Sequence, residues 1–251
     1  MRIARLPPVN LATPGWPPLL ASHGTGSASS QHAHHAMHFV LAADGELAVR
    51  AGRAALAAPG VLTAPDVAHA IDARDREILL VFIDPERAAG SALGAALGGP
   101  LRALDAAARA ALYTRDALAL MQGEGDAWVR RAVARLDAAA PAPRPPIHPR
   151  VRRVLRHLRT LPAGGDTSLA ALAAVAQLSP GRLMHAFTES IGIPLRPYLA
   201  WLRLQRAAGE ITRGTPLSLA AASAGFSDAA HMSRTFRRML GMAPSMLQPA
   251  R

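Results

Sequence analysis

The sequence lacks cysteine and lysine altogether. Without cysteine, the chain can form neither a disulfide framework nor a thiolate metal site. No apolar run approaches the roughly 18 residues that a membrane-spanning helix needs, which argues against an integral membrane protein. The N-terminal stretch MRIARLPPVNLATPGWPP has no continuous apolar segment of the kind found in secretory signals. We therefore expect the protein in the cytoplasm.

What the sequence does contain is 50% hydrophobic residues in a chain of 251, enough to bury a core in one large domain or two ordinary ones. All 28 basic residues are arginine, which a GC-rich coding sequence explains. Their balance against acids is uneven. Residues 1–146 carry 14 Arg and 13 acids, a net charge of +1, whereas residues 147–251 carry 14 Arg and 4 acids, a net charge of +10. This asymmetry indicates a C-terminal segment that meets a polyanion, most often nucleic acid.

A proline-rich stretch separates the two halves. Residues 138–149 read AAAPAPRPPIHP, and their five prolines exclude regular helix and favour an extended connection. We predict a first domain at 1–137, a linker at 138–149 and a second domain at 150–251.

The first domain is predicted to consist mainly of β-strands. MHFVLA at 37–42 and ELAVRA at 46–51 flank Asp44-Gly45, which predicts a hairpin. Gly52-Arg53 is expected to turn the chain again, and EILLVFI at 77–83 reads as a buried strand. Short strands at close intervals are typical of a sandwich or a small barrel.

Apolar residues at a spacing of three and four predict helices in the rest of the chain. In the first domain they predict appended helices at 101–113 and 126–139. The second domain reads as helix throughout, with predicted helices at 149–161, 168–176, 180–191, 195–212, 217–224, 228–240 and a short one after Pro244.

Two segments of the second domain share one design. Residues 168–195 and 216–244 each contain a short Ala-rich helix, a tight turn ending in Ser, a longer helix with a Phe, and then Gly-x-x-Pro. Phe187 in the first segment corresponds to Phe236 in the second. This is the helix-turn-helix arrangement, in which the second helix enters a major groove. One such pattern also fits any Ala-rich bundle, but two on a segment of net charge +10 predict DNA binding.

Residues 150–248 resemble the DNA-binding domain of AraC/XylS-type transcriptional regulators. The similarity is carried by LSPGRLMHAFTESIGIPLRPYLAWLRLQRAAGEI and by AAASAGFSDAAHMSRTFRRMLGMAPSMLQ, the second of which is close to the family signature over nearly its whole length. The resemblance implies two helix-turn-helix units in successive major-groove turns of double-stranded DNA. It further implies a homodimer, RNA polymerase as a second partner, and no enzymatic activity.

The family's roles carry over residue by residue to a set of candidate DNA contacts. They are Gly181, Arg182, Met184 and His185 in the first recognition helix, Ser227, Ala230, His231 and Arg234 in the second, and Arg237 and Arg238 as phosphate contacts. Arginine can bind guanine through two hydrogen bonds, and only Arg182 and Arg234 are placed to do so. Gly181 and Ala230 are too small to hydrogen-bond bases through their side chains. We therefore expect the remaining sequence recognition to depend on methyl contacts and DNA shape. Four further residues are expected to pack inward, namely Leu183, Phe187, Met232 and Phe236.

The first domain also contains a dense group of histidines in QHAHHAMHF, followed by His69. His32, His34 and His38 lie even numbers of positions apart, so an extended strand places them on one face. His35 then points the other way. Three or four imidazoles would suit a divalent transition metal. His34 and His38 lie about 13 Å apart on a straight strand, so a shared site requires a bend before His38.

This half resembles the cupin-like effector domain that often precedes an AraC-type module. The resemblance rests on H-x-H-x-x-x-H at 32–38, on Gly45, and on Pro65 with His69. Metal-binding cupins usually have a carboxylate where this chain has His38, and the second cupin motif lacks its usual glycine. The candidate metal ligands are His32, His34, His38 and His69, with Zn or Ni as the ion. A metal-free pocket for an organic effector and purely structural histidines are the alternatives, and His23 and His35 are spare candidates expected to be exposed.

The sequence as a whole predicts an α+β protein with an N-terminal cupin-like β-barrel, appended helices, and an all-α C-terminal domain with two helix-turn-helix motifs. The predicted function is sequence-specific transcriptional regulation, controlled by a small-molecule or metal effector in the barrel. One alternative is a metal-dependent cupin enzyme fused to a DNA-binding module, although no general acid or base is evident beside the histidines. Glu46 and Asp66 are near them in sequence only. Another is a ligand-independent DNA-binding protein with a vestigial barrel.

Overall fold

The computed structural model describes residues 19–86, 88–120, 124–136, 147–162, 164–241 and 243–247. The chain forms two compact units, a β unit built mainly from residues 17–143 and a helical unit built mainly from residues 144–235. Residues 1–18 of the predicted first domain and 138–146 of the predicted linker lie outside the described residues. Within the described ranges, no helix combines the length and the apolar character that crossing a bilayer requires.

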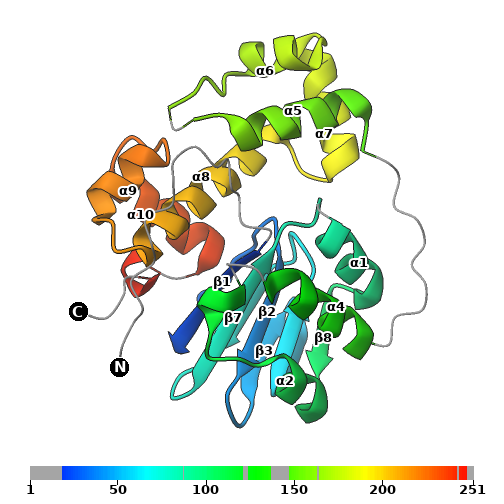
Figure 1. The fold of residues 1–251 in the computed structure, drawn as a ribbon, viewed down its shortest axis with the longest axis vertical. Coiled ribbons are helices and arrows are strands. Elements are labelled where there is room, and N and C mark those ends of the chain that lie inside the picture. Colours follow the sequence, from blue (N-terminus) through cyan, green and yellow to red (C-terminus); the bar gives the residue numbers. More distant parts are fainter. Residues whose placement is uncertain are drawn as a thin grey trace. The chain divides into compact units, whose positions relative to one another are not determined.

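The β unit contains two antiparallel sheets (Figure 1). The larger sheet has the strand order β1 (Leu19–Thr25), β7 (Glu77–Ile83), β2 (Met37–Ala42), β5 (Gly60–Thr63) and β8 (Leu101–Leu104). The smaller sheet has the order β4 (Ala54–Ala58), β3 (Leu47–Ala51) and β6 (His69–Asp72). The α+β class is therefore confirmed, but the described strands form two sheets and no closed cupin-like barrel.

Strand β2 is buried along its whole length because both faces of the larger sheet are covered. Phe39 and Leu41 point into a core shared with the helices α1 (Ala88–Leu97), α2 (Ala106–Leu112) and α4 (Gly125–Arg135). Val40 points into a second core between the two sheets. Double burial explains why the strand reads as a continuous apolar run instead of an alternating one.

The connection between β2 and β3 differs from the predicted hairpin. Asp44-Gly45 does form a turn, with Gly45 at φ 60°. The hairpin prediction is nevertheless wrong, because β2 pairs with β5 and β7 whereas β3 pairs with β4 and β6. The turn carries the chain from one sheet to the other. The hairpin in this region is made by Gly52-Arg53, which joins β3 to β4 with Ala51 opposite Ala54.

The predicted helix at 101–113 is also divided in the structure. Residues 101–104 form β8, because their backbone pairs with β5. Helix α2 begins only after Asp105, whose carboxylate accepts the N–H of Ala108 at 2.7 Å and caps the helix. Helix α4 matches the described part of the predicted helix at 126–139. The three-residue helix α3 (Ala117–Ala119) lies between α2 and α4 in the chain. The apolar spacing does not predict α1.

The helical unit agrees with the prediction to within a residue or two at each helix end. Its elements are α5 (Pro149–Thr160), α6 (Leu169–Ala176), α7 (Pro180–Ile191), α8 (Leu195–Thr212), α9 (Leu217–Ser223), α10 (Ala229–Leu240) and the 3-10 helix η2 (Pro244–Leu247). Local residues cap these helices. Ser168 accepts the N–H of Ala171, Ser179 accepts that of Arg182, and Gly192 ends α7 at φ 90°.

The first helix-turn-helix unit, α6–α7, is fixed by a core of its own. Phe187 of α7 is fully buried, and its ring meets that of Tyr198 in α8 edge to face at 5.2 Å. Helix α6 ends at Gln177 in the left-handed region, with φ 54°. Nη1 of Arg150 in α5 donates to the Gln177 carbonyl at 2.7 Å and so ties α5 to the turn.

Candidate functional site

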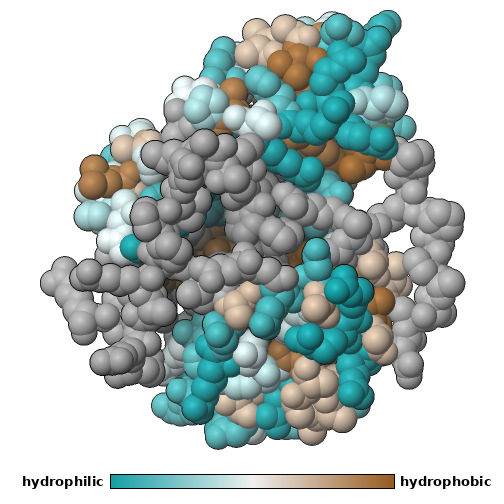
Figure 2. Space-filling model, in the orientation of Figure 1, coloured by the Kyte–Doolittle hydropathy of each residue, from teal (hydrophilic) through white to brown (hydrophobic). Residues whose placement is uncertain are grey.

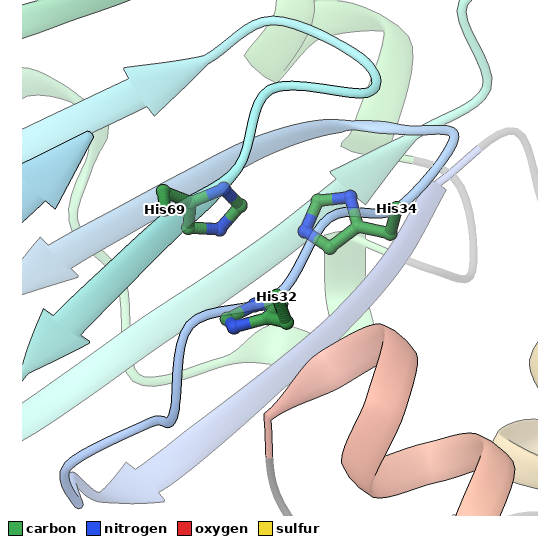
Figure 3. Close-up of side chains that lie close together, drawn as sticks. All are labelled: His32, His34 and His69. Atoms are coloured by element: carbon green, nitrogen blue, oxygen red, sulfur yellow. The ribbon is translucent and has the colours of Figure 1, made fainter. Parts of the chain in front are cut away.

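Three histidines of the β unit come together where the loop before β2 lies beside the start of β6 (Figure 3). His32 and His34 lie in the loop before β2, and His69 begins β6. All three are buried, and each offers a ring nitrogen within 4.8 Å of those of the other two. His32 and His69 form an isolated antiparallel bridge, each donating its backbone N–H to the other's carbonyl at 2.9 Å. We term these residues the histidine group.

Backbone hydrogen bonds orient two of the rings. Nδ1 of His32 lies 2.7 Å from the Ser30 carbonyl, and Nδ1 of His69 lies 2.8 Å from the Val67 carbonyl. Because a carbonyl oxygen can only accept, both Nδ1 atoms must carry the proton. The lone pair of each neutral ring is then on Nε2, which is the arrangement that metal-binding histidines usually show.

Burial keeps the rings of the histidine group neutral. It lowers the pKa of His32 to about 4, the pKa of His34 well below its usual value, and the pKa of His69 in the same direction. Neutral imidazole is the form that binds a metal ion.

His38, the fourth predicted ligand, is not part of the set that lies within 4.8 Å. The bend required before it is present, because the loop turns into β2 at Met37 and brings the His38 ring within 5.0 Å of the His34 ring. The ring stacks on Phe82 at 4.3 Å. Within the described part of the chain, neither of its buried nitrogens has a hydrogen-bond partner, and the same holds for Nε2 of His69. The His38 ring thus lies next to the histidine group, with its centroid 5.0 Å from that of His34 and 5.7 Å from that of His69.

The histidine group fits a divalent transition metal. Zinc bound tetrahedrally at 2.0–2.1 Å sets its ligand nitrogens about 3.3 Å apart. The nitrogens of the histidine group lie within 4.8 Å of one another, so each pair of nitrogens would have to approach by about 1.5 Å or less to bind zinc. Three neutral imidazoles form a donor set suited to zinc or nickel.

The prediction that His35 is exposed is wrong, because its ring is buried between two carboxylates. Its Nδ1 lies 2.7 Å from Asp66 Oδ2 and its Nε2 lies 2.7 Å from Glu86 Oε1. Burial by itself would lower the pKa of His35, but the hydrogen bonds and charges of the two carboxylates outweigh it and raise the pKa to about 9. His35 is therefore an imidazolium that donates from both nitrogens and has no lone pair for a metal. We term His35, Asp66 and Glu86 the carboxylate clamp.

Nothing in the sequence near His35 reveals Glu86, which lies 51 positions further along the chain. Burial raises the pKa of Glu86 to about 7, against the opposing effect of the imidazolium. His23, the other spare candidate, is half-buried, and its Nε2 pairs with the Tyr113 hydroxyl at 2.8 Å.

In α7, the predicted DNA contacts are exposed and the predicted core residues are buried. The exposed side is formed by Gly181, Arg182, Met184 and His185, and the buried side by Leu183 and Phe187. Met184 is 49% exposed, and among the described residues only Leu219 is a comparably exposed large apolar side chain. An exposed methionine at this position suits apolar contact with a thymine methyl group.

Helix α10 repeats this division. The predicted contacts are exposed or, for His231, half-buried: Ser227, Ala230, His231, Arg234, Arg237 and Arg238. Met232 and Phe236 are fully buried. The helix start is fixed by Asp228, whose carboxylate accepts the His231 N–H at 2.6 Å, a bond that lowers the pKa of Asp228. The Ser227 hydroxyl lies 3.1 Å from Nδ1 of His231.

Helix α5 adds a basic face that the contact prediction does not include. Arg152, Arg153 and Arg156 are exposed at helical spacing, while Val151 and Val154 are buried. Hydrophilic side chains cover most of the visible face of this helix (Figure 2). The signal in the sequence is the run PRVRRVLRHLRT, whose arginines follow an amphipathic pattern.

Comparisons with known proteins agree with this layout. Residues 172–249 match the model of a family described as "Helix-turn-helix domain". The chain is 30% identical over 115 residues to the arabinose operon regulatory protein of Escherichia coli, a match covering 44% of this chain and 38% of that protein. The protein of the same name from Salmonella typhimurium is 30% identical over 105 residues, covering 40% and 36%. The chain thus spans less than two fifths of the length of these curated relatives.

Solved structures extend the similarity to the whole fold. The crystal structure of ToxT from Vibrio cholerae superposes with a TM-score of 0.55 over 91% of this chain and 95% of that chain, at 11% identity. A ToxT structure with bound unsaturated fatty acid gives a TM-score of 0.55 over 91% and 93%. At this identity the likeness shows a shared arrangement of a sheet domain followed by a helical domain.

Proposed function

We propose that this chain, whose C-terminal domain is a helix-turn-helix domain of the AraC/XylS type, is a transcriptional regulator that binds specific sites on double-stranded DNA. The observation that carries the proposal is the repeated division of α7 and α10 into an exposed side, which carries the predicted DNA contacts, and a buried apolar side. The net charge of +10 on residues 147–251 and the exposed arginines of α5 supply the attraction to phosphate.

Selection of genomic fragments by the purified protein, followed by gel retardation, tests this function. We expect a small set of fragments to be retained at about 200 mM salt, where non-specific binding has weakened. Failure to retard any fragment at low ionic strength, with zinc and candidate organic effectors supplied, would refute the proposal.

We further propose that the β unit is the sensor and that its effector is a zinc or nickel ion held by His32, His34 and His69. The support is chemical: two rings have their tautomer set by backbone carbonyls, and all three are neutral. A bound ion would act as a cross-link between the loop before β2 and strand β6. An organic effector is the second candidate, because one of the similar ToxT structures holds an unsaturated fatty acid.

Metal analysis separates these candidates. Protein purified without a polyhistidine tag is expected to bind about one zinc or nickel ion per chain. His69→Ala should lose it, while His157→Ala in the helical unit should retain it. A chelator should change the affinity for a selected DNA fragment, and a fatty acid should not. The opposite pair of results would favour the organic effector, and catalytic turnover with unchanged DNA affinity would favour a metal-dependent enzyme fused to a DNA-binding module.

The resemblance to AraC/XylS regulators also supports a homodimer in the cytoplasm that contacts RNA polymerase. Sedimentation over a range of protein concentrations tests the dimer, with and without zinc.

A further inference from the structure

We propose that the carboxylate clamp positions the histidine group for metal binding and links its occupancy to helix α1. The clamp joins three segments that are far apart in sequence: the loop before β2, the loop between β5 and β6, and the turn between β7 and α1. His35 cannot be a metal ligand in this arrangement, because each of its two nitrogens lies 2.7 Å from a carboxylate oxygen and donates a hydrogen bond to it. The inference rests on the proposed metal effector.

The first connection runs from the clamp to the ligands. His35 follows His34 directly, and the backbone N–H of Asp66 donates to the His34 carbonyl at 2.9 Å. Asp66 holds a left-handed conformation, with φ 62°, three residues before His69. A hydrogen bond between the side chains of His35 and Asp66 therefore fixes the loop that carries His34 against the loop that leads to His69.

The second connection runs from the clamp to α1. The Glu86 N–H donates to Asp84 Oδ1 at 2.9 Å, and α1 begins at Ala88. Gly90, in the first turn of α1, packs tightly on the end of β7, since a Cβ added there would lie 2.2 Å from the Asp84 carbonyl oxygen. The start of α1 therefore cannot shift without moving the backbone beside Glu86.

Helix α1 in turn belongs to the helix layer over the larger sheet. Its Leu93 is fully buried in the same core as Trp128 of α4, and α1 contacts α4 directly. When the three rings close on an ion, the loops that carry them must move together. Because the clamp bonds these loops to the turn before α1, a movement of the loops also moves the start of α1.

Removing an outer hydrogen-bond partner of metal ligands typically lowers metal affinity 10- to 100-fold. Glu86 bonds His35 and not a ligand ring, so we expect a smaller effect, with Glu86→Ala weakening zinc binding by up to about 10-fold, measured by competition with a chromogenic chelator. Glu86→Gln keeps an acceptor for His35 and should lose less. Glu77→Ala is the matched control, because Glu77 is a half-exposed carboxylate at the other end of β7 that pairs with Arg115. It should leave zinc affinity unchanged.

Hydrogen exchange gives a second readout that general destabilisation does not produce. In the native protein, zinc should slow exchange in residues 88–97, and in Glu86→Gln this slowing should be reduced although the variant remains folded. By reciprocity, a contact that zinc strengthens must also strengthen zinc binding.

The outcomes distinguish this inference from the proposed function. A native protein that binds no zinc or nickel refutes the metal effector itself. If native protein binds zinc, but Glu86→Ala and Glu86→Gln bind zinc as tightly as native protein does, the clamp has no positioning role. Unaltered exchange in α1 on zinc addition would refute the link to the helices. If Glu86→Ala does not fold, hydrogen exchange in Glu86→Gln decides the question: reduced slowing by zinc in residues 88–97 supports the clamp, and slowing equal to that of native protein refutes it.

Discussion

Replacing Arg234 with alanine is expected to reduce discrimination between a selected DNA site and random DNA, with little effect on folding. Arg234 is exposed in the middle of α10, one turn after Ala230. An arginine that donates two hydrogen bonds to a base contacts a single guanine, so Arg234 is expected to read one base pair. Because the side chain is exposed, the free energy of unfolding should change by no more than about 0.5 kcal/mol.

The size of the effect follows from the chemistry of the guanidinium. Two hydrogen bonds to guanine contribute about 1–3 kcal/mol of discrimination against a wrong base. This corresponds to a loss of roughly 5- to 150-fold in affinity for the selected site. Arg237→Ala is the matched control in the last turn of the same helix. If it contacts phosphate, it should weaken binding to both DNAs about equally and reduce the salt slope by about 1.

Fluorescence anisotropy with the selected site and a scrambled duplex of the same length, at several salt concentrations, measures both quantities. Circular dichroism confirms that each variant is folded. If the two variants lost the same factor on both DNAs, with the same change in salt slope, the assignment of Arg234 to base readout and Arg237 to phosphate would be wrong.

Three further predictions concern the rest of the molecule. Gly181→Ala meets no atom within 4 Å, so thermal stability should hold or rise, whereas DNA affinity should fall if the methyl group occupies space at the groove; melting curves and anisotropy test both. In metal-free protein, His32 has its pKa lowered from 6.5 to about 4, so its contribution is complete above pH 6.5. Protonation of His32 alone should therefore cost about 3 kcal/mol as the pH falls to 4. Because His34, His38 and His69 also have lowered pKa values, both proteins should lose stability, and urea unfolding with a chelator should show a loss about 3 kcal/mol larger in native protein than in His32→Ala. Phe187→Ala should cost the helical unit about 3–5 kcal/mol in urea unfolding, and a loss below 1 kcal/mol would mean that the core refills the cavity.

The helical unit could be predicted almost completely because its signals are local. Ser179-Pro180 marks the start of α7, and Gly192 marks its end, within a few residues of the backbone groups that they satisfy. The burial of Phe187 follows from helical periodicity for the same reason. The exposure of the predicted contact residues could also be predicted from the sequence, whereas their contacts with DNA stay predictions.

The β unit was less predictable because strand pairing is not local. The turn at Asp44-Gly45 is real, but which strands pair depends on the cores on either side of β2. Residues 101–104 have helical spacing, yet hydrogen bonds with β5 make them a strand. The sequence grouped the histidines and required the bend before His38. It gave no sign of the burial of His35, because Glu86 approaches it only in the folded sheet.

The positions of the histidine group and the clamp along the chain have a consequence for biosynthesis. All of these residues precede position 87, and the described strands and helices of the β unit are complete by Leu136. A ribosome therefore completes the histidine group and the clamp before it has translated α5, the first described helix of the helical unit. On the proposal that the histidine group binds a metal ion, loading could begin on the nascent polypeptide, before the helical unit has formed.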